Sequence, residues 1–294
     1  MRTGVVLVNP SRVGSVSALR ETFSRVLLQE GWTEPVWIET EPENDKREVV
    51  REAIGQGAEV LFACGGDGTV VTALAPLAGS DVALAVVPLG TGNVLARNLG
   101  LPLDLPRAIR TGTGTGRRRI DLGEVEGRLF SVAAGIGLDA QMLADAPRRA
   151  KSRLGWWVYV AATIRRLGEP RFAVQIRVDS GPWHIRQVRS VLVANVGRLP
   201  GGINLVPNAS PDDGLLDVAI LSPRNLGDWA WLLASMVGSR PSRTRIETFR
   251  GRRVEIMTTV PQAREVDGES LSVGTELSVT VRPSSLTVCV PCHF

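Results

Sequence analysis

Apolar residues in the first third of the chain follow two alternating patterns. Continuous apolar runs, typical of buried strands, lie at residues 4–8, 36–38, 60–63 and 82–87. Between them, apolar residues recur at helical spacing over residues 16–27 and 49–54. Fully apolar strands separated by amphipathic helices predict a parallel sheet with helices on both faces. Ligands of such sheets bind beyond the carboxyl ends of the strands, so we expect the chemistry in the loops after these runs.

The pattern changes near Thr111, where a Gly/Thr-rich stretch, residues 111–116, predicts a linker. Short strand-like runs then lie at residues 120–125, 130–134, 172–178, 191–196, 216–221, 253–257, 277–281 and 286–290. Two helix-like segments, 154–167 and 225–237, interrupt them. The sequence therefore predicts an α/β domain over residues 1–116 and a mostly antiparallel β domain, sandwich or barrel, over residues 117–294. A cleft between two such domains is the expected place for an active site.

The charge and cysteine content narrow the classes of protein to consider. The 294 residues carry 34 Lys and Arg against 30 Asp and Glu, and Lys46 and Lys151 are the only lysines. The arginines are scattered among acidic residues without a recognition motif, which argues against nucleic-acid binding. No run reaches the ~18 to 20 apolar residues of a membrane-spanning helix, and the first residues show no signal-peptide pattern. Three cysteines, an odd number, suit reduced thiols, so we expect a cytoplasmic protein.

The strongest local signal is a glycine-rich loop at the end of the third predicted strand. Residues 64–69 read Cys-Gly-Gly-Asp-Gly-Thr, and the apolar residues after them read as a helix. Such a loop turns several N–H groups toward an anion, and the helix N-terminus adds positive potential. Asp67 would repel a phosphate unless a cation lay between them, which indicates Mg²⁺ carried by a nucleotide. A tight turn with Asp as helix cap is the simpler alternative.

Two more loops of this kind follow neighbouring strands. Residues 88–93 read Pro-Leu-Gly-Thr-Gly-Asn after the fourth strand, and residues 9–14 read Asn-Pro-Ser-Arg-Val-Gly after the first. Glycine-rich loops on neighbouring strands can hold one polyphosphate from two sides. The Gly-Lys-Ser/Thr sequence of a Walker loop does not occur in the chain. Neither the loop at residues 64–69 nor that at residues 88–93 has the glycine spacing of a dinucleotide-binding loop.

Two turns in the second part of the chain carry candidate carboxylates. Residues 267–269, Asp-Gly-Glu, follow a strand-like stretch, and Glu269 on a tight turn beside a cleft suits a general base that deprotonates an alcohol. A plain hairpin turn gives the same Asp-Gly pattern. Residues 211–215, Pro-Asp-Asp-Gly-Leu, form a plain turn or an oxygen-rich Mg²⁺ site that uses a carboxylate and a backbone carbonyl.

The ordered set of motifs resembles the bacterial diacylglycerol kinase and sphingosine kinase-like lipid kinase family over essentially the whole chain. The motifs are residues 65–69, residues 88–93, Asn195 with Gly201, Gly202 and Pro207, residues 213–218, and residues 267–269. The resemblance implies an α/β nucleotide-binding domain, similar to that of NAD kinases and phosphofructokinases, and a C-terminal β-sandwich. In such enzymes the last strands can pack back onto the first domain.

By position, the resemblance implies ATP and Mg²⁺ as ligands. Asp67 would arrange metal and nucleotide, and Glu269 would accept the proton. The implied ATP-site residues are Asn9, Pro10, Ser11, Thr40, Gly65, Gly66, Asp67, Gly68, Thr69, Thr91 and Asn93. The residues implied for a structural Mg²⁺ are Asp213, the Leu215 carbonyl, Ser210 and Asp212. The chain departs from the family at Ser210, where the family often has a metal-binding Asp, and in its first loop, which is one residue longer.

The activity implied by the resemblance is transfer of the γ-phosphate of ATP to the hydroxyl of a lipid such as diacylglycerol. A sphingoid base, ceramide or a polyprenol is an alternative acceptor. An NAD kinase, which shares the Gly-Gly-Asp-Gly-Thr loop, and a catalytically silent lipid-binding regulator are the other readings. A peripheral protein at the membrane surface is expected, and a homodimer is left open. Segments 154–167 and 229–233, rich in Trp with basic residues near the first, either contact the membrane or pack on the β domain.

Overall fold

The computed structural model describes residues 2–40, 47–137, 171–199, 203–204, 206–222 and 246–292. The chain forms two compact units, Met1–Ile120 with Ser284–Phe294, and Asp121–Pro283. Strands β5 (Arg117–Val125) and β16 (Glu269–Cys289) each contribute residues to both units. The last residues of the chain therefore belong to the same unit as its beginning.

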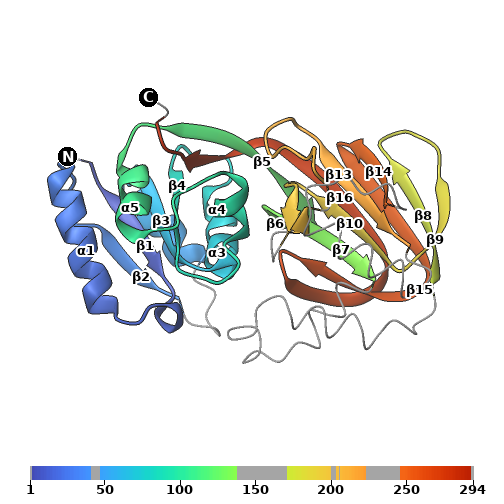
Figure 1. The fold of residues 1–294 in the computed structure, drawn as a ribbon, viewed down its shortest axis with the longest axis horizontal. Helices are drawn as coiled ribbons and strands as arrows, with labels where there is room; N and C mark the ends of the chain where they lie inside the picture. Colours follow the sequence, from blue (N-terminus) through green and yellow to red (C-terminus); the bar gives the residue numbers. More distant parts are fainter. Residues whose placement is uncertain are drawn as a thin grey trace. The chain divides into compact units, whose positions relative to one another are not determined.

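A parallel sheet forms the centre of the first unit, as the apolar runs predict. Its strands are β1 (Gly4–Val8), β2 (Val36–Glu39), β3 (Val60–Gly65) and β4 (Ala83–Pro88), in the order β2-β1-β3-β4. The end of β16 adds a parallel neighbour to β4, where Val288 pairs with Leu84. Every residue of β1, β3 and β4 is buried, because helices cover this sheet (Figure 1).

Side chains cap the starts of the helices at residues 10–12, 16–29 and 105–113. The helices of this unit are η1 (Pro10–Arg12), α1 (Val16–Gln29), α2 (Arg47–Gly55), α3 (Asp67–Leu77), α4 (Val94–Asn98) and α5 (Leu105–Thr113). Phe23 of α1 packs edge-on against Phe62 of β3, with ring centroids 5.3 Å apart.

The prediction of a linker at residues 111–116 is wrong in part, because residues 111–113 are the last turn of helix α5. Asp104 caps the helix and Ile109 is fully buried, which outweighs the low helix propensity of its glycine and threonines.

The second unit is a mostly antiparallel β-sandwich, which confirms the predicted fold class. In addition to β5 and β16, its strands are β6 (Arg128–Phe130), β7 (Ala133–Gly137), β8 (Phe172–Val178), β9 (His184–Val188), β10 (Ser190–Ala194), β11 (Arg198–Leu199), β12 (Ile203–Asn204), β13 (Leu216–Leu221), β14 (Ile246–Gly251) and β15 (Arg253–Val266). The main order is β14-β13-β10-β7-β15-β16, with β8 paired to β15 and β9. One apolar core, including Phe130, Ile136 and Val218, fills this unit.

Three sequence predictions for this unit change in detail. The runs at 277–281 and 286–290 are parts of one strand, β16, and the run at 253–257 continues to Val266. The run at 130–134 divides between β6 and β7. The segments 154–167 and 225–237, and with them residues 229–233, lie outside the described residues. Among the residues that are described, no helix is long and apolar enough to cross a bilayer.

Candidate functional site

The two glycine-rich loops after β3 and β4 lie directly against each other. The N–H groups of Leu89 and Gly90 both donate to the carbonyl oxygen of Gly65, over 2.8 and 3.1 Å. A Cβ atom on Gly90 would lie 2.5 Å from the Cα atom of Gly66. The close approach therefore requires a residue without a side chain at position 90.

The loops after β1 and β2 reach the same edge of the sheet. The N–H of Asn9 donates to the carbonyl of Cys64 over 3.1 Å, and the N–H of Thr40 donates to the carbonyl of Val8 over 2.8 Å. Asn9 caps η1, because its Oδ1 accepts from the Ser11 N–H at 3.1 Å and the Ser11 hydroxyl at 2.7 Å, with Pro10 in the first turn. Asn9, Pro10, Ser11 and Thr40 are thus at the carboxyl edge that the sequence predicts.

Helix α3 begins inside the first glycine-rich loop. Its N-cap, Gly66, provides no side-chain cap, and Thr69 and Val70 donate their N–H groups to the Gly66 carbonyl. Gly68 is exposed in the first turn, whereas Thr69 is buried. The N-terminus of a helix has N–H groups without partners inside the helix, and it is the positive end of the helix dipole. It therefore suits an anion such as a phosphate.

Asp67 lies between the two glycine-rich loops, at the start of α3. Its Oδ1 accepts from the Val94 N–H at 2.6 Å, and a Cβ atom on Gly92 would lie 2.6 Å from its Oδ2. Burial raises the pKa of Asp67, while hydrogen bonds from Val94 and Asn93 and the charge of Arg97 act to lower it. A carboxylate fixed at this edge, beside amides that suit an anion, fits a cation that would be carried by a bound nucleotide.

Asn93 has a structural role that the sequence did not reveal. Its backbone is left-handed, with φ 47°. Its Oδ1 accepts from the Gly90 N–H at 3.1 Å, and its Nδ2 donates to the Gly90 carbonyl at 2.7 Å. Arg97 adds a further bond, from Nε to the Gly92 carbonyl at 3.0 Å. These contacts hold the shape of the second loop, while Thr91 at its tip is exposed.

Replacing Gly90 with alanine is expected to lower the free energy of unfolding by about 1 to 3 kcal/mol, because the new methyl group must displace the backbone of Gly66. Gly68→Ala is the matched control. A Cβ atom at position 68 meets no atom within 4 Å, so its stability should be close to wild type. Denaturant unfolding of the three proteins measures both effects. Equal stability of the two variants would contradict the close packing of the loops.

Glu269 follows a tight turn that a buried carboxylate holds in place. Val266 and Glu269 pair across the end of the β15–β16 hairpin, with Asp267 and Gly268 in the turn at φ 45° and 82°. The Asp267 carboxylate accepts from the N–H groups of residues 131, 132 and 133 over 2.8 to 3.0 Å, and from the Ser131 hydroxyl at 3.1 Å. Burial raises the pKa of Asp267 to about 6, against the lowering effect of these bonds. The turn is therefore anchored to the segment between β6 and β7.

The carboxylate of Glu269 itself is exposed. Its nearest described cation is Arg128, with Nη1 4.0 Å from Oε2 and both side chains about half exposed. The next N–H in the turn, that of Gly268, donates to Oε2 of Glu265 at 2.8 Å. Glu269 is thus held by a fixed backbone and its side chain is open to solvent.

Asp267→Asn is expected to destabilise the fold by about 1 to 3 kcal/mol. Each carboxylate oxygen of Asp267 accepts from two of the four donors. Asparagine has only one acceptor oxygen, so two of these donors would face its NH₂ group instead. Asparagine tolerates the left-handed backbone at position 267, so the substitution isolates the side-chain effect. Chemical denaturation of wild type and variant is the measurement, and an unchanged unfolding midpoint would show that these bonds do not hold the turn.

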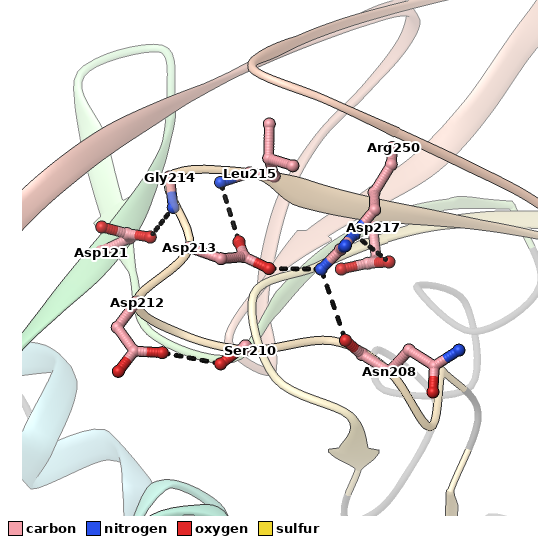
Figure 2. A network of polar contacts seen from close by, with 9 residues as sticks. All are labelled: Asp121, Asn208, Ser210, Asp212, Asp213, Gly214, Leu215, Asp217 and Arg250. Carbon is pink, nitrogen blue, oxygen red and sulfur yellow. Dashed lines mark hydrogen bonds and ion pairs between the residues drawn. The ribbon is translucent and has the colours of Figure 1, made fainter.

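The predicted Mg²⁺ residues lie in the loop before β13 (Figure 2). Ser210 donates its hydroxyl to Oδ1 of Asp212 at 2.6 Å, and the Leu215 N–H donates to Oδ1 of Asp213 at 3.0 Å. The other oxygen of Asp213 pairs with Arg250. Within the described ranges, no group of three or more His, Cys, Asp or Glu side chains is arranged to hold a metal ion. Because Asp213 already accepts from the Leu215 N–H and pairs with the positive charge of Arg250, its carboxylate fits a structural Mg²⁺ poorly as it lies, while the Leu215 carbonyl stays a predicted ligand.

Asp121 and Asn195 connect this loop to the turn of Glu269. Asp121, buried in β5, accepts from the Gly214 N–H at 2.6 Å. The Asn195 side chain donates to the carbonyls of Asp121 and Ser131, at 2.9 and 3.1 Å. Sequence reasoning placed Asn195 in a motif but missed Asp121, although a lone Asp within an apolar run is a usable signal. Gly201 and Gly202 of the same motif lie outside the described residues.

The candidate residues thus fall into two sets, one in each unit. The first set, the four loops at the carboxyl edge with Asp67, lies in the first unit, and Glu269 and the Asp213 loop lie in the second. The sequence prediction that the loops after the parallel strands converge on one sheet edge is confirmed by their hydrogen bonds.

Comparisons with known families cover nearly all of the chain. Residues 3–125 match the family described as Diacylglycerol kinase catalytic domain, and residues 130–290 match the family described as YegS C-terminal NAD kinase beta sandwich-like domain. The boundary between the two matches falls close to the one between the compact units.

The chain is also similar to individual proteins over most of its length. The chain is 34% identical over 271 residues to a Pseudomonas savastanoi protein named "Probable lipid kinase YegS-like", covering 90% of this chain and 86% of that one. It is 31% identical over 231 residues to the diacylglycerol kinase of Bacillus subtilis, covering 76% of each. Its fold is similar to that of a diacylglycerol kinase crystal structure from Bacillus anthracis, with a TM-score of 0.75 and 21% identity over 99% of this chain and 97% of that one.

Proposed function

We propose that this chain, which belongs to the bacterial lipid kinase family with a diacylglycerol kinase catalytic domain and a YegS-like C-terminal domain, transfers the γ-phosphate of ATP to a lipid hydroxyl. The observation that carries the proposal is the close-packed pair of glycine-rich loops, with Asp67 fixed between them at the start of α3. The Pseudomonas savastanoi relative is named a probable lipid kinase and the Bacillus subtilis relative a diacylglycerol kinase, which supports the lipid acceptor.

The nucleotide half of the reaction is assigned to the first unit. The N–H groups at the start of α3 and in the loop after β4 would bind the phosphates, with Asn9, Ser11, Thr40 and Thr91 around the same edge. Mg²⁺, arriving with ATP, would offset the charge of the phosphates. Asp67 is the residue that would hold this ion, because its carboxylate is fixed by the Val94 N–H.

The proton is assigned to Glu269. An attacking hydroxyl must lose its proton as the bond to phosphorus forms, and an exposed carboxylate on a rigid turn can accept it. Asp267 holds that turn through four hydrogen bonds, so Glu269 is presented without rearrangement of the backbone. In-line transfer then needs orientation and charge stabilisation and no covalent intermediate on the protein.

Diacylglycerol is the acceptor we propose first, with a sphingoid base, ceramide or a polyprenol as alternatives. Each of these is an apolar alcohol, so the reaction would take place at a membrane surface, with the protein bound peripherally. An NAD kinase would phosphorylate a soluble acceptor, and a silent lipid-binding regulator would phosphorylate none.

Purified protein incubated with γ-labelled ATP, Mg²⁺ and each acceptor in mixed micelles separates these readings. We expect the strongest labelling of the product formed from diacylglycerol, and no labelling when NAD is the acceptor. Labelled NADP would support the NAD kinase reading, and the absence of any labelled product alongside lipid binding would support the regulator.

A further inference from the structure

Two acidic side chains near the start of β13 share one arginine. Arg250 of β14 pairs with Asp213 in the loop before β13, and its Nε lies 3.2 Å from Oδ1 of Asp217 on that strand (Figure 2). A third contact runs from Nη2 of Arg250 to the carbonyl oxygen of Asn208, at 3.3 Å. The guanidinium group thus contacts three oxygen atoms from three parts of one loop and strand.

The backbone fixes this arginine in place. Asp217 and Arg250 are directly opposite each other in the antiparallel pairing of β13 with β14, which runs in continuous register from Leu216 to Leu221. Side chains opposite each other in such a pair lie close together, so opposite charges attract. The position of Arg250 follows from the sheet and does not depend on the conformation of the loop.

The two carboxylates require a positive charge at this point. Asp217 is only 5% exposed, and burial raises its pKa. The negative charge of Asp213 raises that pKa further, while Arg250 lowers it. Two neighbouring carboxylates, one of them buried, are costly without a cation between them.

We propose that Arg250 is the built-in cation of this loop, and that the loop therefore keeps its fold without a divalent metal ion. The only carboxylate of the implied Mg²⁺ set that lies beside Arg250 is Asp213, and both of its oxygen atoms already have partners in the chain: one accepts from the Leu215 N–H, and the other pairs with Arg250. The proposal concerns the fold of the second unit and is independent of the proposed kinase activity.

The test is thermal unfolding of the nucleotide-free protein. The midpoint of each protein, wild type or variant, is measured once with a chelator and once with millimolar Mg²⁺. The wild-type midpoint should be the same in both conditions. Arg250→Met should lower the midpoint by on the order of 5 °C in chelator, because Asp213 and Asp217 lose their counter-charge. Added Mg²⁺ should restore part of that loss, and Asp213→Asn in the same variant should abolish the restoration.

Arg253→Met is the matched control. Arg253 lies on β15, the next strand along the chain, and its side chain is 59% exposed, so its ion pair with Glu255 should contribute little. A wild-type midpoint that rises with Mg²⁺ would overturn the proposal, as would an Arg250→Met midpoint no lower than that of Arg253→Met. The wild-type comparison decides the question even when Arg250→Met fails to fold.

Discussion

Asp67→Asn is expected to lower kcat by at least roughly 10²- to 10³-fold, with little change in stability. The amide oxygen can still accept the Val94 N–H, so the packing of the two glycine-rich loops is preserved. The negative charge is lost, and with it the group that would hold the cation carried by ATP. Steady-state kinetics with saturating ATP and a fixed lipid acceptor measure the effect.

Asp81→Asn is the control for this substitution. Asp81 is exposed and precedes β4, so it lies at the amino ends of the parallel strands, opposite the glycine-rich loops. Its loss should leave kcat within about twofold of wild type, as expected for a surface change away from the site. If Asp67→Asn retained wild-type turnover, the assignment of the cation to Asp67 would be wrong.

Glu269→Gln is expected to reduce kcat by about 10²- to 10⁴-fold, the range measured for loss of a general base. Glutamine has the same shape, and the turn is held by Asp267 and not by Glu269, so the fold should be unchanged. ATP binding should also be unchanged, because the proposed phosphate-binding groups belong to the first unit. Kinetics and equilibrium ATP titration of the same preparation separate the two effects.

Glu276→Gln, an exposed position on the same strand β16, is the matched control and should keep near wild-type activity. An activity profile in which Glu276→Gln and Glu269→Gln behave alike would remove Glu269 from the reaction. A loss of ATP affinity in Glu269→Gln would point to a binding role in place of proton transfer.

The parallel sheet and its loops could be predicted because the signals are local. Strands β1, β3 and β4 are buried along their whole length, so their sequences are continuously apolar, and each glycine-rich loop follows its strand directly. Helix α5 was missed because Gly112 and its threonine neighbours resemble a linker, although Asp104 and Pro106 give a start signal.

Other features depend on pairing between distant segments. Strand β16 resembles two strands because Pro283 and Ser284, the latter with φ 48°, interrupt its apolar pattern. The role of Arg250 depends on its place opposite Asp217, 33 residues earlier in the chain. Nothing in the residues around position 250 indicates this partner, so only the sheet register reveals it.

The most direct test of lipid phosphorylation follows the γ-phosphate itself. Wild type, Asp67→Asn and Glu269→Gln are incubated with γ-labelled ATP and vesicles that contain diacylglycerol. The amount of label is then measured in the organic phase, in inorganic phosphate and in the remaining ATP. The account predicts that wild type moves label from ATP into the organic phase and that neither variant does so above background. Label that reaches only inorganic phosphate or a soluble product, or equal lipid labelling by all three proteins, would contradict it.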